Sequence, residues 1–280
     1  MSLVVLLLFI LLLVVFVLFI IHYCGKDEMI YDYCIISAFN LELQEIIDRI
    51  KIVKIIKRLE RNIYIGTYKG KKLILCLTGQ GLVNAALTCQ YLIENFKFDK
   101  LIFSGIAGGI ADYLQLGDIV VGSSFAQIDY SKLSDETDEK PNFPQPYVGI
   151  QFECENNFEF VMETEYFDKQ IVKTKFLYDR NTEIPQIHNK PYNIYTEGIV
   201  LSSSQFVGNP NYVEQIKGFT SFNFVAVDME SSSIANVCLQ NKKKFAIIRA
   251  ISDKADTGDV EDIQKVVKNV VDYVLTFITY

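Results

Sequence analysis

Acidic side chains stand where apolar stretches of this 280-residue sequence end. Asp228 and Glu230 flank Met229 at the end of "FNFVAVDME", and Asp253 follows Ser252 at the end of "KKFAIIRAISD". A carboxylic acid can protonate a leaving group, and a carboxylate can take a proton from an attacking water. Acid–base chemistry is therefore the first kind of catalysis that these residues suggest.

Two further charged residues stand in similar places. Glu42 comes just after the apolar stretch "YDYCIIS", at the opening turn of an expected helix, and Arg249 lies inside the last apolar stretch. Ligands of open α/β sheets bind where parallel strands end, so we expect these groups to meet at one edge. Non-catalytic explanations stay open for these acids, because an acid is favourable at any helix N-terminus and Asp253 could simply cap a helix.

Glycines at 79, 81, 105, 108 and 109 interrupt the same region, where backbone could approach a ligand closely or make tight turns. The run "SGIAGG" fits neither a dinucleotide-binding nor a triphosphate-binding motif. The sequence therefore gives no support for a nucleotide cofactor of either kind.

Other residue types exclude several chemistries. The two histidines, His22 and His188, lie beside the apolar leader and in a loop-like stretch, which disfavours a Ser–His–Asp triad and a His-based metal site. The six cysteines form no C-x-x-C pair and suggest packed free thiols. We therefore expect no metal and no cofactor. The formal net charge of −7 gives no reason to expect nucleic-acid binding.

The first residues form an apolar leader. Residues 3–21 contain no polar side chain, and at ~1.5 Å per residue a helix of this length spans the ~30 Å of a bilayer core. We therefore expect a single-pass transmembrane anchor at 1–22 and a linker at 23–29. Lys26 on the C-terminal side favours a cytosolic domain. A cleaved signal segment, which would make the protein secreted, is the alternative.

Residues 30–280 alternate between strand and helix patterns, which predicts one α/β domain with a largely parallel central sheet. The spacing of apolar residues predicts helices at 40–60, 83–96 and 260–278. A hairpin is expected over 62–78, and other strands at 31–37, 100–105, 117–124, 196–202, 223–228 and 244–250. The acidic, proline-containing stretch at 131–165 is expected to be a surface excursion.

Four segments together resemble the nucleoside phosphorylase/nucleosidase superfamily: "LTGQGLVNAAL", "LIFSGIAGGIADYLQLGDIVVGS", "AVDMESSSIANVC" and "AIIRAISDKAD". Within it, the sequence is most similar to 5′-methylthioadenosine/S-adenosylhomocysteine nucleosidases. The resemblance covers about residues 30–280 and implies a single-domain, three-layer fold with a mixed, largely parallel sheet. It also implies hydrolysis of the N-glycosidic bond of purine nucleosides without cofactor or metal. A homodimer is implied too, with the site completed by the partner around 127–147.

The resemblance assigns catalytic roles to residues already singled out. Asp253 would protonate or hydrogen-bond the purine N7, and Ser252 would orient it. Glu230 would accept hydrogen bonds from the ribose hydroxyls, held in place by Arg249. Glu42 would be the general base that activates the attacking water.

The resemblance also implies a set of substrate-binding residues around these groups. Met229 would offer an apolar surface to the sugar, and Phe206 would stack on the purine. The remaining members are Asp228, Val207, Ile106, Ala107 and Gly108. Ile106 departs from the pattern of the family, which usually has Ser or Thr there, and Ser204 stands where Asp is frequent.

Two other functions stay open at this point. A phosphorylase must bind phosphate, which needs Arg side chains and backbone donors. The loop "SAFNLELQ" contains no Lys or Arg and offers Glu42, so the residues favour water over phosphate. A non-catalytic nucleoside-binding or storage protein is the second alternative. It would be favoured if Glu42, Glu230 or Asp253 were missing, and all three are present.

Overall fold

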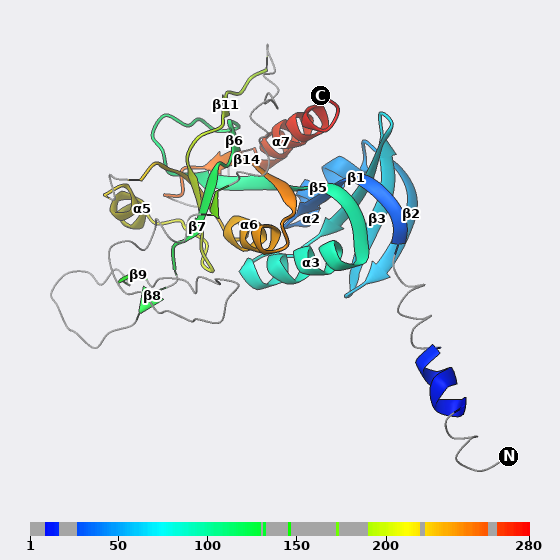
Figure 1. Cartoon of the computed structure of the whole chain (residues 1–280). Coiled ribbons are helices and arrows are strands. Elements are labelled where there is room, and N and C mark those ends of the chain that lie inside the picture. Colours follow the sequence, from blue (N-terminus) through cyan, green and yellow to red (C-terminus); the bar gives the residue numbers. More distant parts are fainter. Residues whose placement is uncertain are drawn as a thin grey trace.

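A computed structural model gives the fold of the chain (Figure 1). It describes residues 9–16, 27–129, 131–132, 145–146, 172–173, 190–218, 222–256 and 262–280. The helices that cover the central sheet are α2 (Asn40–Ile47), α3 (Leu82–Asn95), α5 (Pro210–Lys217), α6 (Ser231–Gln240) and α7 (Ile263–Phe277).

Twelve strands of the described chain form one mixed sheet. They are β1 (Asp27–Ser37), β2 (Lys51–Arg58), β3 (Arg61–Tyr68), β4 (Lys71–Leu77), β5 (Phe96–Gly109), β6 (Ile119–Val121), β7 (Ser124–Gln127), β10 (Val172–Lys173), β11 (Ile194–Tyr195), β12 (Ile199–Ser202), β13 (Phe224–Asp228) and β14 (Lys244–Asp253). Two short strands, β8 (Ser131–Lys132) and β9 (Gln145–Pro146), pair separately.

The long strand β5 is the centre of this sheet. It pairs in parallel with β1 and with β14, and β1 pairs in parallel with β4. Near its end β5 also pairs with β13, in the antiparallel sense. The carboxyl ends of β1, β5 and β14 therefore lie at the same edge of the sheet, where open α/β folds bind ligands. The expected α/β fold with a mixed sheet is present.

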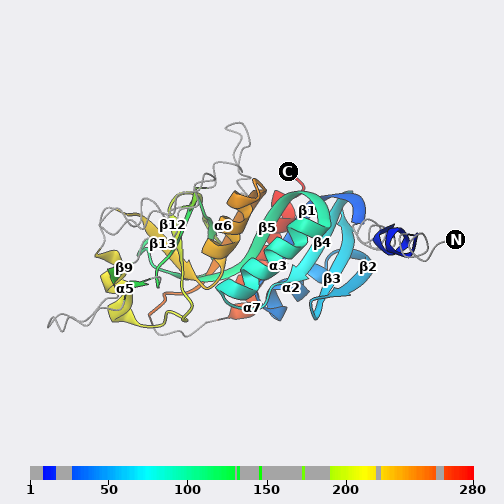
Figure 2. The same ribbon diagram turned by 60° about the horizontal axis from the view of Figure 1, so that its bottom comes forward.

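The sheet is buried because both of its faces carry apolar side chains that alternate along each strand. In β1, Cys34 and Ile36 belong to the core under α3 and α6, while Ile35 belongs to the core under α2 and α7. Figure 2 shows α3 and α6 side by side on one face of the sheet. Burying one such side chain contributes about 1.5–3 kcal/mol, so the two apolar layers fix the strand ends that position the site.

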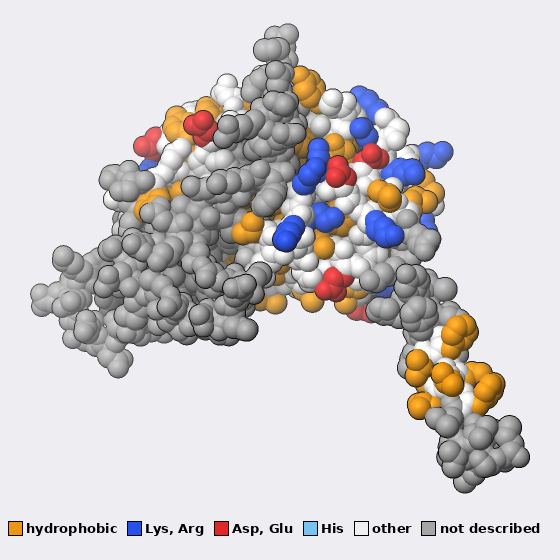
Figure 3. Space-filling model, in the orientation of Figure 1, with side chains coloured by type: hydrophobic (Ala, Val, Ile, Leu, Met, Phe, Trp, Pro, Cys, Tyr) orange, Lys and Arg blue, Asp and Glu red, His pale blue; other side chains and the backbone are white. Residues whose placement is uncertain are grey.

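The helix predicted over 40–60 is wrong in its second half. The helix α2 ends at Ile47, and residues 51–58 form the edge strand β2. This strand is mostly exposed, and Val53 and Ile55 are more than half accessible. Its sequence therefore lacks the alternation of apolar and polar residues that would mark a half-buried strand. Figure 3 shows Lys and Arg side chains among acidic and apolar ones over this end of the molecule, and charge on an edge strand discourages unwanted pairing.

Most other expected elements are present. The hairpin formed by β3 and β4 turns at Lys69 and Gly70, and the predicted helices at 83–96 and 260–278 correspond to α3 and α7. The helix α5 was not predicted. The excursion expected at 131–165 lies outside the described residues, apart from β8 and β9.

The prediction of a transmembrane anchor at 1–22, and with it of a membrane-anchored localisation, is wrong. Residues 9–16, the part of the leader that the structure describes, are helical. Throughout the described residues, no helix combines the length and apolar character needed to cross a membrane.

Candidate active site

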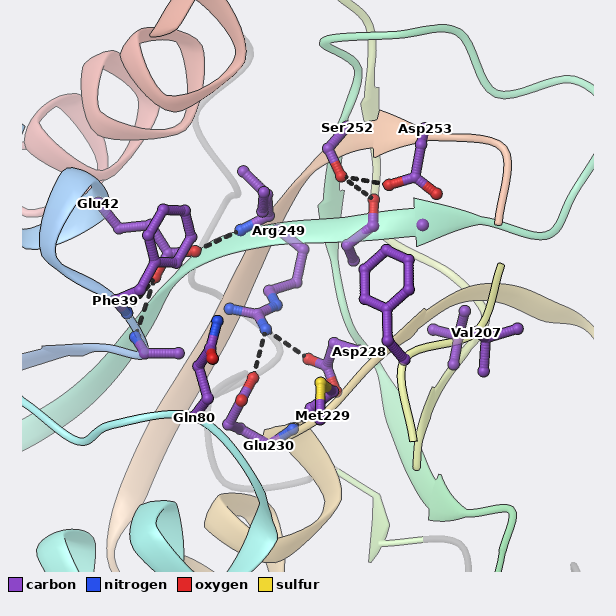
Figure 4. Close-up of a pocket in the computed structure, with 16 residues that line it drawn as sticks. Phe39, Glu42, Gln80, Val207, Asp228, Met229, Glu230, Arg249, Ser252 and Asp253 are labelled. Atoms are coloured by element: carbon purple, nitrogen blue, oxygen red, sulfur yellow. Dashed lines mark hydrogen bonds and ion pairs between the residues drawn. The ribbon is translucent and has the colours of Figure 1, made fainter. Parts of the chain in front are cut away.

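A cavity opens at the edge of the sheet where β1, β5, β13 and β14 end (Figure 4). Its walls come from these strand ends, from the loop between β4 and α3, and from the loop that follows β12. The residues that line it are Ala38, Phe39, Glu42, Gln80, Ile106, Ala107, Gly108, Phe206, Val207, Val227, Asp228, Met229, Glu230, Arg249, Ser252 and Asp253.

Glu42 is held at one end of this cavity by main-chain donors. It occupies the third position of α2, from which its Oε2 accepts hydrogen bonds from the backbone N–H groups of Ala38 (2.9 Å) and Phe39 (3.2 Å). Its Oε1 accepts one from the N–H of Ile106 in β5 (2.9 Å). Burial raises the pKa of the Glu42 carboxyl to about 7, against the opposing effects of Arg249 and these hydrogen bonds. A carboxylate with this pKa can exchange protons near neutral pH.

Arg249 is the buried cation at the centre of the site. Its Nη2 lies 2.8 Å from Asp228 Oδ2 and 3.2 Å from Glu230 Oε2. The guanidinium carbon lies 4.1 Å from the ring centroid of Phe103, so the cation stacks on the face of this ring. Its Nε and Nη1 make no hydrogen bond to a described residue. Arg249 can therefore hold the two carboxylates and still donate to a ligand.

Glu230 connects two helices at the cavity wall. It immediately precedes α6, and its Oε1 accepts a hydrogen bond from the N–H of Gly81, which immediately precedes α3 (2.8 Å). Its other oxygen faces Arg249. Burial raises the pKa of Glu230, and the charge of Arg249 opposes that shift. Each oxygen keeps a lone pair for a ligand hydroxyl.

Asp228 lines the cavity, but groups of the chain occupy both of its carboxylate oxygens. Its Oδ1 accepts hydrogen bonds from Ser202 Oγ (2.7 Å) and from the N–H groups of Glu230 and Ser231 (3.1 Å each). Its Oδ2 accepts from Ser231 Oγ and pairs with Arg249. The Asp228 carboxylate therefore satisfies the first N–H group of α6 and pairs with Arg249.

Asp253 lies at the other end of the cavity, at the last position of β14. Its Oδ2 accepts a hydrogen bond from Ser252 Oγ (2.7 Å), and its Oδ1 accepts one from the N–H of Ala255 (2.7 Å). The side chain is only 4% exposed. Two donors thus fix the carboxyl group in one orientation, while each oxygen keeps a lone pair for a shared proton.

Comparison with known proteins places this arrangement in a family. Residues 32–279 match the family model of the phosphorylase superfamily. The chain belongs to the phosphorylase superfamily. It is 31% identical over 195 residues to the 5′-methylthioadenosine/S-adenosylhomocysteine nucleosidase of Listeria innocua, covering 69% of this chain and 73% of the relative. It is 28% identical over 233 residues to the protein of the same name from Buchnera aphidicola, covering 82% of this chain and 87% of the relative.

A solved structure agrees with these sequence relatives. The 5′-methylthioadenosine/S-adenosylhomocysteine nucleosidase of Neisseria meningitidis, in complex with methylthio-immucillin-A, has a TM-score of 0.63 and 25% identity to this chain. The match covers 89% of this chain and 98% of that one. The likeness thus extends over almost the whole of the solved nucleosidase.

Two glycines allow the charged groups of this phosphorylase-superfamily site to approach the sheet. A Cβ atom at Gly105 would overlap Arg249 Nη1 and Glu42 Oε1. A Cβ atom at Gly108 would lie 3.0 Å from Asp253 Oδ1 and would also crowd Ala255. Gly105 and Gly108 are therefore needed for the close approach of these side chains to β5.

The loop after β12 forms the outer rim. Phe206 is 62% exposed at the mouth of the cavity, with the partly buried Val207 beside it. This loop is tied to the sheet by Asp129, whose Oδ2 accepts hydrogen bonds from the N–H of Ser204 and from Ser203 Oγ. Asp129 was not singled out in the sequence, and only its position just after β7 connects it to the site.

All twelve residues predicted from the sequence line this one cavity. The lining residues that were not predicted are Ala38, Phe39, Gln80 and Val227. Gln80 lies between Gly79 and Gly81, both of which have positive φ (+78° and +90°), so the glycine pair was a signal for a residue presented by a sharp turn.

Carboxyl groups outnumber cations in the site. Four buried carboxyl groups, those of Glu42, Asp228, Glu230 and Asp253, surround the single guanidinium of Arg249. Such a site stabilises positive charge that develops on a ligand and repels anions. Among the residues that the structure describes, no group of three His, Cys, Asp or Glu side chains could hold a metal ion.

Proposed function

We propose that this chain is a purine nucleosidase that hydrolyses the N-glycosidic bond of 5′-methylthioadenosine or S-adenosylhomocysteine and releases adenine. The observation that carries the proposal is the pair of fixed carboxyl groups, Glu42 and Asp253, at the two ends of one cavity. The names of the Listeria, Buchnera and Neisseria relatives support the same activity.

Asp253 is the group that acts on the leaving base. As the N-glycosidic bond breaks, its electron pair moves into the purine, and a proton or hydrogen bond at N7 stabilises the departing adenine. The bonds from Ser252 Oγ and the Ala255 N–H hold the carboxyl group in place for that contact. Val207 lies on the side of Asp253 in Figure 4, and with Phe206, its neighbour on the rim, it would cover the purine ring.

Glu230 and Arg249 act on the sugar. A ribose diol can donate to both oxygens of the Glu230 carboxylate, which Arg249 and the Gly81 N–H hold in position. Met229 offers its apolar side chain to the sugar ring. The surrounding carboxylates stabilise the positive charge that develops on the ribosyl ring as the base departs.

Glu42 supplies the base for the nucleophile. Its ionised carboxylate accepts a proton from a water molecule whose oxygen then bonds to C1′ of the sugar. The unpaired N–H groups of Arg249 lie near Glu42 and can hold the oxygen of that water. The products are adenine, which carries the proton from Asp253, and a free ribose derivative with the new hydroxyl on C1′.

Water is preferred over phosphate as the nucleophile because of the charges at the Glu42 end. A phosphate dianion there would face Glu42 and Glu230, and Arg249 is the one cation that lines the described cavity. The apolar side chains of Phe39 and Ile106 add no donors for a phosphate oxygen. This charge pattern supports hydrolysis over phosphorolysis.

We also propose that the protein is a homodimer. Val83 and Leu87, one helical turn apart on α3, are 81% and 52% exposed, and Phe206 is 62% exposed at the cavity mouth. Apolar side chains left exposed on one helix face and at a cavity mouth suit a protein interface, where apolar and aromatic residues are enriched. Sedimentation of the native chain and of Val83→Lys tests this, and an unchanged monomeric mass for both would contradict it.

The activity is tested with the full-length chain. Adenine release from 5′-methylthioadenosine is followed with and without phosphate, for the native chain, for Asp253→Asn and for the control Asp99→Asn, an exposed acid at the other end of β5. We expect release without phosphate, a loss of about 10²- to 10⁴-fold in Asp253→Asn and no loss in the control. Release that requires phosphate would identify a phosphorylase, and no release would contradict catalysis on this substrate.

A further inference from the structure

The turn between β4 and α3 presents one polar side chain to the cavity that the mechanism does not use. Gln80 lines the cavity, and its side-chain amide forms no hydrogen bond with any described residue. In Figure 4 this side chain extends toward Arg249 and Glu230, on the side of Phe39 and away from Asp253. A primary amide offers two donors and one acceptor, so it can bind a polar group of a ligand.

The backbone around Gln80 is fixed. Arg61 donates from Nε and Nη2 to the carbonyl oxygen of Thr78 (3.1 and 2.8 Å), and Asn84 Nδ2 donates to the carbonyl of Gln80 (2.9 Å). The next residue, Gly81, donates its N–H to Glu230. The amide of Gln80 is therefore carried by a turn that is directly bonded to the carboxylate proposed to bind the ribose diol.

The position of Gln80 within the cavity identifies the part of the substrate that it faces. With the purine at Asp253 and the diol at Glu230, the rest of the sugar extends toward the end lined by Phe39 and Gln80. The atoms of a nucleoside that remain at this end are C4′ and the 5′ substituent. Phe39 offers that substituent an apolar ring, whereas Gln80 offers hydrogen bonds.

We infer that Gln80 selects the 5′ group of the substrate, and that the enzyme prefers purine nucleosides whose 5′ substituent carries hydrogen-bonding groups over those with a plain alkylthio group. This inference rests on the proposed nucleosidase function. A 5′ hydroxyl, or the amino-acid tail of S-adenosylhomocysteine, can pair with the amide. A methylthio group cannot, and it displaces water from the amide without replacing the lost hydrogen bonds.

The test compares kcat/KM for adenosine, S-adenosylhomocysteine and 5′-methylthioadenosine in the full-length native chain, in Gln80→Leu and in Gln240→Leu. Gln240 is a matched control, because it is exposed at the end of α6, away from the cavity. One neutral hydrogen bond contributes ~1 kcal/mol, which corresponds to a factor of about five. We expect the ratio of kcat/KM for the polar substrates to that for 5′-methylthioadenosine to fall about fivefold or more in Gln80→Leu and to stay unchanged in Gln240→Leu.

The possible failures are distinguishable. If the native chain releases adenine and Gln80→Leu keeps the native ratio, the inference is wrong and the nucleosidase function stands. If the native chain releases adenine from none of the three nucleosides, the proposed function is wrong and the inference falls with it. An unchanged thermal midpoint for Gln80→Leu, expected for an exposed side chain, separates a change in selectivity from a loss of folding.

Discussion

The pH dependence of hydrolysis should report the ionisation of Glu42. As general base, Glu42 must be ionised, and its burial raises its pKa to about 7. At pH 5 a carboxyl group with a pKa near 7 is about 1% ionised, whereas an ordinary glutamate is about four-fifths ionised. We therefore expect kcat/KM to fall about 100-fold between the plateau and pH 5, with a limb of unit slope or steeper below about pH 7.

The assay is adenine release from a saturable nucleoside substrate over pH 4.5–9, in buffers of constant ionic strength. Glu230, whose pKa burial also raises, contributes to the same limb because it too must be ionised to accept the ribose hydroxyls. Glu42→Gln should be inactive across the range, with Glu94→Gln, an exposed acid on α3, as its control.

One substitution separates the two ionisations. Ile106→Ser adds a hydroxyl beside the Glu42 carboxylate, because the N–H of residue 106 already bonds Glu42 Oε1. The added hydrogen bond reduces the effect of burial, so the acid limb should move to lower pH by about one unit. A native profile that is flat from pH 5 to 8, or a limb that Ile106→Ser leaves in place, would refute this account of the base.

Four further predictions follow from the contacts of the site and its surroundings. Gly105→Ala should lower kcat/KM about 100-fold, because the new Cβ displaces both Arg249 and Glu42; near-native rates would contradict the close approach described for β5. Asp228→Asn should lower the free energy of unfolding, measured in urea, by about 3–5 kcal/mol because it leaves Arg249 without its nearest buried partner, and a loss below ~1 kcal/mol would argue against that role. The pKa of the Glu42 carboxyl is higher in the folded than in the unfolded chain. Its contribution to stability is therefore complete below about pH 4 and is lost as the pH rises through about 7. The unfolding free energy of Glu42→Gln minus that of the native chain should rise by about 3 kcal/mol between pH 4 and 8. Iodoacetamide labelling of the native protein, read by mass spectrometry, should leave the four described cysteines unmodified because all are buried. They are Cys34, Cys76, Cys89 and Cys238. Rapid labelling of any of them in the native protein would contradict this packing.

The sequence predicted which residues line the cavity better than it predicted the bounds of the elements. Asp253 ends the buried strand β14, whose parallel pairing with β5 was expected to bring their carboxyl ends together. Glu230 follows the buried strand β13, and its place beside that edge comes from an antiparallel pairing of β13 with the end of β5. The length of α2 could not be predicted in the same way. Residues 51–58 lie on an exposed edge, where neither burial nor alternation identifies a strand, and their pairing with β3 decides the structure.

The roles of individual residues within the site also depended on the structure. Asp228 and Glu230 are two residues apart in one motif, yet five chain groups occupy the oxygens of Asp228 while Glu230 keeps lone pairs toward the cavity. Gln80 gave only an indirect signal, because an isolated polar residue between glycines is common in turns. Contacts between distant segments, such as that of Gly81 with Glu230, are set by packing and cannot be predicted from local sequence patterns.

The attachment of Glu42 to main-chain groups has a consequence for how the protein can change. The three N–H donors that hold this carboxylate belong to residues 38, 39 and 106, and any residue other than proline would supply them. The place of the base is thus a property of the fold. Phe39 and Ile106 can be exchanged for other side chains, which alters the surface presented to the substrate, while the base stays where it is. Variation at these two positions therefore offers a route to new substrates that keeps the base in its place.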